Sequence, residues 1–149
     1  MRAIDFASRA PRHKRSALEQ LLFFNGCQQR VARDIVDVID KYGPPEIIDD
    51  GEGLRVRVSS LPDVQCLFAI ERSTDRPIGV AVYMRADLEH VTVLHLGVAE
   101  DYCAGGRDES LNLPLRLVRE VRRTSRRIKG VRRLEVAYCT QRARASSAC

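Results

Sequence analysis

The sequence predicts one domain of the α+β or α/β class, in which two N-terminal helices precede a mixed, mostly antiparallel sheet and one crossover helix follows near the C-terminus. Three observations predict it. The chain has 149 residues and 44% hydrophobic content, enough for one core. Its middle third consists of apolar runs with short turns. Near the C-terminus, an amphipathic helix separates two apolar runs, which is the order of a βαβ unit. We expect the domain to span residues 1–140 and the polar tail 141–149 to be disordered.

The N-terminal third predicts one short strand and two helices. Met1–Ala7 alternates weakly between apolar and polar residues, as an edge strand would. From Ser16, a candidate N-cap, leucines recur at helical spacing as far as residues 25–26, which are Asn-Gly. A second helix is predicted over 28–42 and ends at Gly-Pro-Pro. The acidic stretch 46–53 lacks the ligand spacing and the closing Glu of a calcium loop, and we expect a solvated loop there.

Four apolar runs in the middle of the chain predict strands. In Leu54–Val58, apolar residues alternate with arginines, which indicates a half-buried strand. The other three are Val64–Ile70, Ile78–Met84 and His90–Val98. Because the turns between them are short, we expect neighbouring strands to run antiparallel in a meander.

The segment Leu113–Lys129 gives the strongest helix prediction. One face is mainly apolar (Leu113, Leu117, Val121, Thr124, Ile128), whereas arginines occupy the other side (Arg116, Arg119, Arg122, Arg123, Arg126). Asn112 or Ser110 is a candidate cap, and Gly130 is placed to end the helix. The run Leu134–Tyr138 then predicts a strand that a right-handed crossover sets parallel to His90–Val98.

Charge and cysteine content restrict the classes of function. Twenty-two of the 25 basic residues are arginine and the net charge is +5, which suits an anionic ligand or partner. The arginine face of Leu113–Lys129 could bind a phosphate backbone, but Glu120 interrupts it and aromatic residues are few. We therefore expect a solvated face and no nucleic-acid partner. No long apolar run or signal peptide is present in this sequence, so we expect a soluble cytoplasmic protein without membrane contact.

The cysteines argue against a metal or disulfide scaffold. There are five, widely spaced and without a C-x-x-C pair: Cys27, Cys66, Cys103, Cys139 and Cys149. We expect no metal site and no disulfide framework. Cys66 and Cys139 lie in apolar runs typical of core cysteines. Cys103 lies in a polar loop and is the candidate reactive thiol.

Three segments resemble the GCN5-related N-acetyltransferase (GNAT) superfamily. Leu94–Tyr102, with the letters LHLGVAEDY, is similar to that family's signature strand, roughly L-x-L-x-V-x-P-x-Y. Ile128–Val136 resembles its helix end and fifth strand, and Arg76–Ala81 its third strand. The resemblance covers most of the chain from Ser16 to Tyr138 and implies a diverged or reduced member with the same fold.

The resemblance also implies an activity and a site. In that fold the fourth and fifth strands splay apart, and the pantetheine arm of acetyl-CoA or another acyl-CoA lies between them like an added strand. The main chains of Leu96 and Val98 would contact it. The next loop and helix start would hold the pyrophosphate through Gly105, Gly106, Arg107 and Ser110. An amine substrate would attack the thioester carbonyl, polarised by main-chain N–H groups.

Departures from the family pattern leave alternatives open. The loop 103–114 is longer than the family's pyrophosphate loop and contains Asp108 and Glu109. The family's tyrosine acid lies beyond the fifth strand, where this sequence has only about ten residues, and no catalytic residue is assigned. A second copy could complete the site by pairing through an exposed sheet edge. His95 is either a base or a structural histidine, and we favour the structural role. The alternative to an acyltransferase is a noncatalytic binding module of the same fold, and a basic nucleic-acid-binding domain is the least favoured.

Overall fold

The computed structural model describes residues 3–23, 32–61, 63–103, 112–128 and 130–137. Its elements in chain order are β1 (Ile4–Ala7), η1 (Arg12–Lys14), α1 (Arg15–Phe23), α2 (Ala32–Tyr42), β2 (Pro45–Asp49), β3 (Leu54–Val58), β4 (Gln65–Glu71), β5 (Arg76–Arg85), β6 (His90–Val98), η3 (Glu100–Tyr102), α3 (Leu113–Ser125) and β7 (Arg133–Val136). The fold is α+β, as predicted. None of the helices in the described ranges is long and apolar enough to cross a membrane.

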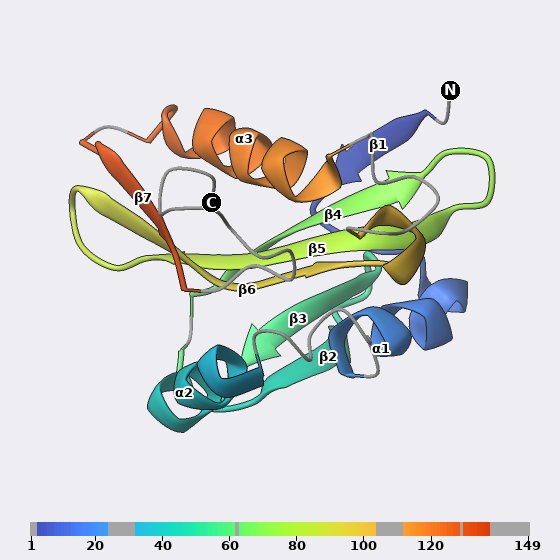
Figure 1. Ribbon diagram of the computed structural model, residues 1–149, viewed down its shortest axis with the longest axis horizontal. Helices are drawn as coiled ribbons and strands as arrows, with labels where there is room; N and C mark the ends of the chain where they lie inside the picture. Colours follow the sequence, from blue (N-terminus) through green and yellow to red (C-terminus); the bar gives the residue numbers. More distant parts are fainter. Residues whose placement is uncertain (1–2, 24–31, 62, 104–111, 129, 138–149) are drawn as a thin grey trace.

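The main sheet has five strands in the order β1-β4-β5-β6-β7. All neighbours are antiparallel except β6 and β7, which run parallel and are joined through α3. The predicted edge strand, the meander of β4 to β6 and the βαβ unit are therefore confirmed. In Figure 1, α3 covers one face of this sheet, and α1, α2 and the β2–β3 hairpin lie on the other face.

The hairpin of β2 and β3 corrects two expectations. Residues 46–49 form a strand and not a loop, and Leu54–Val58 pairs with that strand in a separate two-stranded sheet, outside the meander. Ile47 is buried and pairs with Val56. In the sequence this apolar position is hard to recognise, because acidic residues surround it. The acidic turn is stabilised from a distance, because Arg9 and Arg12 form ion pairs with Asp50 and Asp49.

Besides these ion pairs, main-chain and thiol hydrogen bonds join the hairpin to the rest of the chain. The main chains of Ala10 and Leu54 exchange two hydrogen bonds, of 2.8 and 2.9 Å. The thiol of Cys66 on β4 donates to the Val56 carbonyl at 3.0 Å, and the Val56 N–H lies 3.3 Å from the same sulfur. Buried side chains of β3, such as Val56 and Val58, complete the contact with the core below α1.

Two helix boundaries differ from the predicted ones, and a third lies where it was predicted but lacks the side-chain cap. The turn η1 runs directly into α1, so Ser16 lies inside the helix and is not its cap. Asn112 occupies the N-cap position of α3 with a left-handed φ of 49° but makes no side-chain cap hydrogen bond. That helix ends at Ser125, before the predicted Lys129, and the turn into β7 uses Gly130 at φ 95°. Residues 28–31 of the predicted second helix lie outside the described residues.

Two hydrophobic layers hold the sheet between its helices. Val80, Val82 and Leu94 face the α1 side, whereas Ala81, Leu96 and other residues pack against α3. The packing below α3 is close at Gly79, where a Cβ would lie 2.7 Å from Leu117 Cδ1. The strands β5 and β6 are thus buried on both faces. A binding site can therefore form along their main-chain edges or at their ends.

Candidate functional site

The described pairing of β6 with β7 ends at Val93, Leu94, Val136 and Ala137, and we call this place the fork. Pairing of β6 with β7 begins at His90 opposite Arg133 and ends at Val93 opposite Val136. The last link is a 2.8 Å hydrogen bond from the Ala137 N–H to the Val93 carbonyl. Beyond it β6 continues to Val98, and within the described ranges no strand pairs with its outer edge.

A β-bulge lies at the same point of β6. Val82 pairs with His95, but the next residue of β5, Tyr83, pairs with Val93, so Leu94 is an extra residue in β6. A bulge bends its strand and re-aims the main chain beyond it. The end of β6–β7 pairing and the change of direction of β6 therefore coincide.

Leu96 presents its main chain to the outer edge of β6. The Ala99 N–H donates to the Ile78 carbonyl beside β5 at 2.8 Å. Because main-chain groups alternate in direction along a strand, those of Leu96 and Val98 point away from β5. The carbonyl oxygen of Val98 lies 3.3 Å from Cys103 Sγ, and this contact partly covers it. Of the two strand residues predicted to contact a cosubstrate, Leu96 is therefore the better placed.

The other predicted binding residues, Gly105, Gly106, Arg107 and Ser110, lie outside the described residues. Cys103 is described, and it is buried and disulfide-bonded. The candidate reactive thiol is therefore not a free thiol, and the expectation of no disulfide framework did not anticipate this bond. Its polar neighbours in sequence do not reveal that its side chain packs into the core on the α3 side of the sheet.

His95 lies in the core directly after the bulge. Its side chain is 1% exposed, and burial lowers the pKa of the imidazole to about 4, so the ring is neutral at neutral pH. It lines neither of the two pockets described below. This burial favours the structural role over that of a base.

A pocket of about 320 Å³ adjoins the fork, and we call it the fork pocket. It lies between α2 and the paired part of β6 and β7. Its polar lining residues are Asp34, Asp37, Lys41, Tyr42, Thr92 and Glu135, and its apolar ones are Val38, Val136 and Ala137. Thr92 and Glu135 are paired across the two strands. Three carboxylates against one ammonium group give the pocket a negative charge, which favours a cationic ligand.

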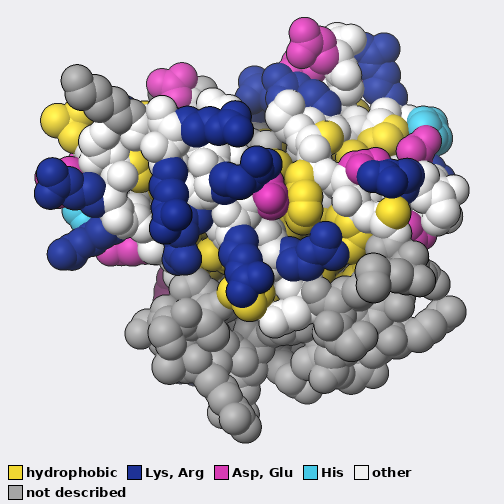
Figure 2. Space-filling view, turned by 90° about the horizontal axis from the view of Figure 1, so that it is seen from above, with side chains coloured by type: hydrophobic (Ala, Val, Ile, Leu, Met, Phe, Trp, Pro, Cys, Tyr) yellow, Lys and Arg dark blue, Asp and Glu magenta, His cyan; other side chains and the backbone are white. Residues whose placement is uncertain are grey.

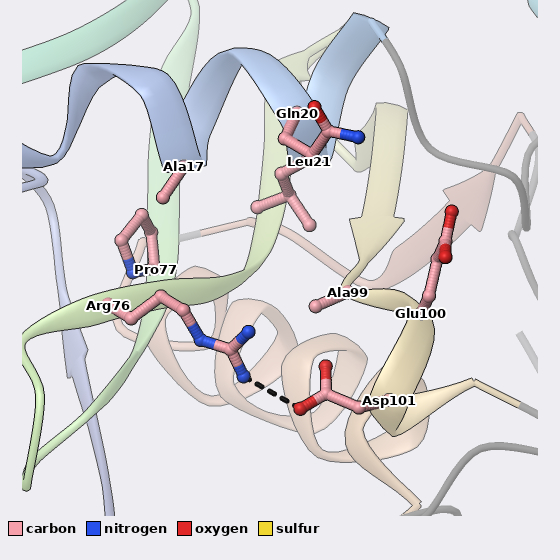
Figure 3. Close-up of a pocket in the computed structure, with 8 residues that line it drawn as sticks. All are labelled: Ala17, Gln20, Leu21, Arg76, Pro77, Ala99, Glu100 and Asp101. Atoms are coloured by element: carbon pink, nitrogen blue, oxygen red, sulfur yellow. Dashed lines mark hydrogen bonds and ion pairs between the residues drawn. The ribbon is translucent and has the colours of Figure 1, made fainter.

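A second pocket, of about 410 Å³, lies at the far end of β6. Figure 3 shows it between α1, the start of β5 and η3, with the Arg76 side chain directed toward Asp101. These two groups form a 2.7 Å ion pair, and Glu71 lies 3.7 Å from the same guanidinium nitrogen. Glu71 is buried and accepts a 2.6 Å hydrogen bond from the Tyr102 hydroxyl. Arg76 is thus compensated by carboxylates, and this end of the sheet is a structural network.

Sequence reasoning did not find either pocket. The residues of the fork pocket come from α2, β6 and β7, which lie far apart in the sequence, and those of α2 belong to no motif. The helical spacing of Asp34 and Asp37 was a usable signal, because it puts both carboxylates on one face of α2. Among the described residues, no group of three or more His, Cys, Asp or Glu side chains could hold a metal ion.

Comparison with known proteins gives no match. No protein-family model matches the chain, and neither a curated protein nor a solved structure is significantly similar to it. Any functional assignment therefore rests on the fork, on the pocket beside it and on the charges of the surface.

Proposed function

We propose that this protein is an acyl-CoA-dependent N-acyltransferase, with acetyl-CoA as the expected donor, and a diverged or reduced relative of the GNAT superfamily. The observation that carries the proposal is the fork. Pairing of the parallel strands stops at Val93 and Val136, at the position where Leu94 bulges from β6. A splayed parallel pair at this place is what the resemblance of Leu94–Tyr102 implies.

The outer edge of β6 suits the pantetheine arm of CoA. That arm is an extended chain with two amide groups, and it can add to a strand edge by main-chain hydrogen bonds. Leu96 offers its N–H and carbonyl in the required direction. The Leu96 side chain is fully buried toward α3, which fixes the main chain in place. The thioester end of such an arm would reach the fork.

The fork pocket suits an amine that carries positive charge. Asp34, Asp37 and Glu135 attract a cation, and Lys41 is the single opposing charge. In the reaction, the neutral amine nitrogen attacks the thioester carbonyl carbon. A C–N bond forms, the C–S bond breaks, CoA leaves as the thiolate and the nitrogen loses a proton. Glu135, one residue before the end of β7, is the proposed proton acceptor.

The first experiment measures binding and transfer separately. Binding of CoA and acetyl-CoA is followed by calorimetry and by thermal unfolding, for which a ligand at 100 times its Kd stabilises the fold by about 2.7 kcal/mol. Release of the CoA thiol is then measured with a polyamine, a lysine peptide and, as a matched control, the anionic amine of glutamate. We expect binding of both CoA forms and transfer only to the cationic amines.

Two tryptophan variants locate the site. Ala137→Trp fills the fork pocket and should abolish transfer, whereas Ala17→Trp fills the second pocket and should leave transfer unchanged. Binding of CoA without transfer to any amine would favour the alternative, a noncatalytic binding module. The absence of CoA binding would refute the acyltransferase, and equal loss of transfer in the two variants would refute the assignment of the reaction to the fork pocket.

A further inference from the structure

The positive charge of this protein is concentrated in one helix. The stretch Arg116–Arg127 contains six arginines and one glutamate, an excess of five positive charges. The formal net charge of the whole chain is also +5. The remaining basic and acidic residues therefore balance, and α3 with the turn that follows it accounts for the entire excess.

Arginines elsewhere in the described part of the chain are largely neutralised. Seven of them lie within ion-pair distance of a carboxylate: Arg9, Arg12, Arg15, Arg55, Arg57, Arg72 and Arg76. The arginines of α3 differ. Within the described residues only Arg123 has such a partner, Glu120 at 2.8 Å. Charges that are not compensated within the protein remain available to an external anion.

Three of these uncompensated arginines, together with the paired Arg123, share one exposed face, which we call the arginine face. It consists of Arg119, Arg122, Arg123 and Arg126, all exposed. At 100° per residue these side chains fall within about 100° of the helix circumference. The opposite side of α3 packs on the sheet through Leu117 and Val121. Figure 2, which looks onto this side of the molecule, shows Lys and Arg side chains predominating over acidic ones.

Against the expectation of a solvated face and no nucleic-acid partner, we infer that the arginine face binds the phosphate backbone of double-stranded nucleic acid without reading its sequence. The face is about 10 Å long from Arg119 to Arg126 at 1.5 Å per residue. A duplex carries about one negative charge per 1.7 Å of its axis, so this length of duplex contains about six phosphates on its two strands. Guanidinium groups bind phosphate oxygens in pairs of hydrogen bonds, which a lysine cannot do. This inference is independent of the proposed acyltransfer, because the fork pocket opens beside α2, on the other side of the sheet.

The composition of the face excludes the two nearest alternatives. A single strand is held by stacking its bases on aromatic side chains, and no aromatic residue occurs between Arg116 and Arg127. A helix that lies on a membrane inserts large apolar side chains from its exposed face. Apart from arginines, the exposed or half-exposed residues between Arg119 and Arg127 are Glu120 and Thr124. A rigid polyanion that needs neither stacking nor insertion fits best.

The test is binding of a fluorescein-labelled DNA duplex, followed by anisotropy between about 50 and about 200 mM salt. We expect the logarithm of the binding constant to fall linearly with the logarithm of salt concentration, with equal affinity for duplexes of unrelated sequence. The triple variant R119Q/R122Q/R126Q removes three phosphate contacts and should reduce the salt slope by about 3. Its thermal unfolding is measured alongside to show that it folds.

A matched variant separates the arginine face from net charge. R12Q/R57Q/R72Q also removes three positive charges, but from exposed arginines that are paired with carboxylates, and it should bind the duplex like the parent protein. Equal weakening in both triple variants would overturn the inference, as would failure of the parent protein to bind. Binding to phosphatidylcholine vesicles that contain phosphatidylglycerol, with none to the duplex, would instead assign the face to anionic lipid and also overturn it.

Discussion

Acid should destabilise this protein through His95, before most carboxylates titrate. The imidazole has a pKa of about 4 in the folded chain because it is buried, and about 6.5 when the chain is unfolded. Protons therefore bind the unfolded state more tightly between these two values. The stability that the neutral ring confers is complete above about pH 6.5 and is lost as the pH falls toward 4.

The size of the loss follows from the two pKa values. Proton linkage gives a decrease of about 2 kcal/mol in the free energy of unfolding between pH 7 and pH 5, and about 3 kcal/mol down to pH 4. The carboxyls of Asp5, Asp50 and Asp87 have pKa values held below normal by their partners, so their contribution is lost only at lower pH.

Urea unfolding at pH 7 and pH 5 measures this loss. His95→Gln keeps a polar side chain but removes the titration, and its stability should change little between the two pH values. His13→Gln, in the exposed turn before α1, should retain the full loss. If the His95 variant loses as much stability in acid as the parent protein does, His95 is not the cause of the loss.

Three further predictions concern the core. Gly79→Ala puts a Cβ 2.7 Å from Leu117 Cδ1 and should cost about 1–3 kcal/mol in urea unfolding; combined with Leu117→Ala it should cost less than the sum of the two single changes, and a neutral effect would contradict the close packing. Tyr102→Phe removes a 2.6 Å hydrogen bond to the buried carboxylate of Glu71 and should lower the free energy of unfolding by about 1–3 kcal/mol. An unchanged urea midpoint would show that this bond contributes nothing to stability. Burial raises the pKa of the Cys66 thiol to about 11, so iodoacetamide at mildly alkaline pH should alkylate this residue only after unfolding. Peptide mass spectrometry measures the labelling, and rapid alkylation of Cys66 in the folded chain would contradict its burial.

Local periodicity predicted the elements whose burial follows one simple pattern. The strands β4, β5 and β6 are continuous apolar runs because both faces of the sheet are covered, and α3 has one apolar face because it packs on that sheet from one side. The parallel direction of β7 followed from the crossover rule alone. The strands and α3 depend on residues that are close in sequence. The direction of β7 depends on the right-handedness of crossover connections, which holds for nearly all proteins.

Features set by distant partners were not predicted. The acidic residues around Ile47 conceal a strand, because their charges are compensated by Arg9 and Arg12 from another part of the chain. Ser16 satisfies the capping pattern, but the preceding turn already continues into the helix. The fork itself could be inferred only from the family resemblance. The pocket beside it could not, because its charged residues meet only after α2 packs near β7.

The β2–β3 hairpin implies that this domain does not open as one unit. It lies outside the five-stranded ladder, and apart from apolar contacts its described polar links to the other strands and to Ala10 are few. Native-state hydrogen exchange should therefore divide the backbone amides into two groups. Amides of β5, bonded between β4 and β6, exchange only through global unfolding. Those of β2, at the edge of the hairpin, exchange through a smaller opening that leaves the fork intact.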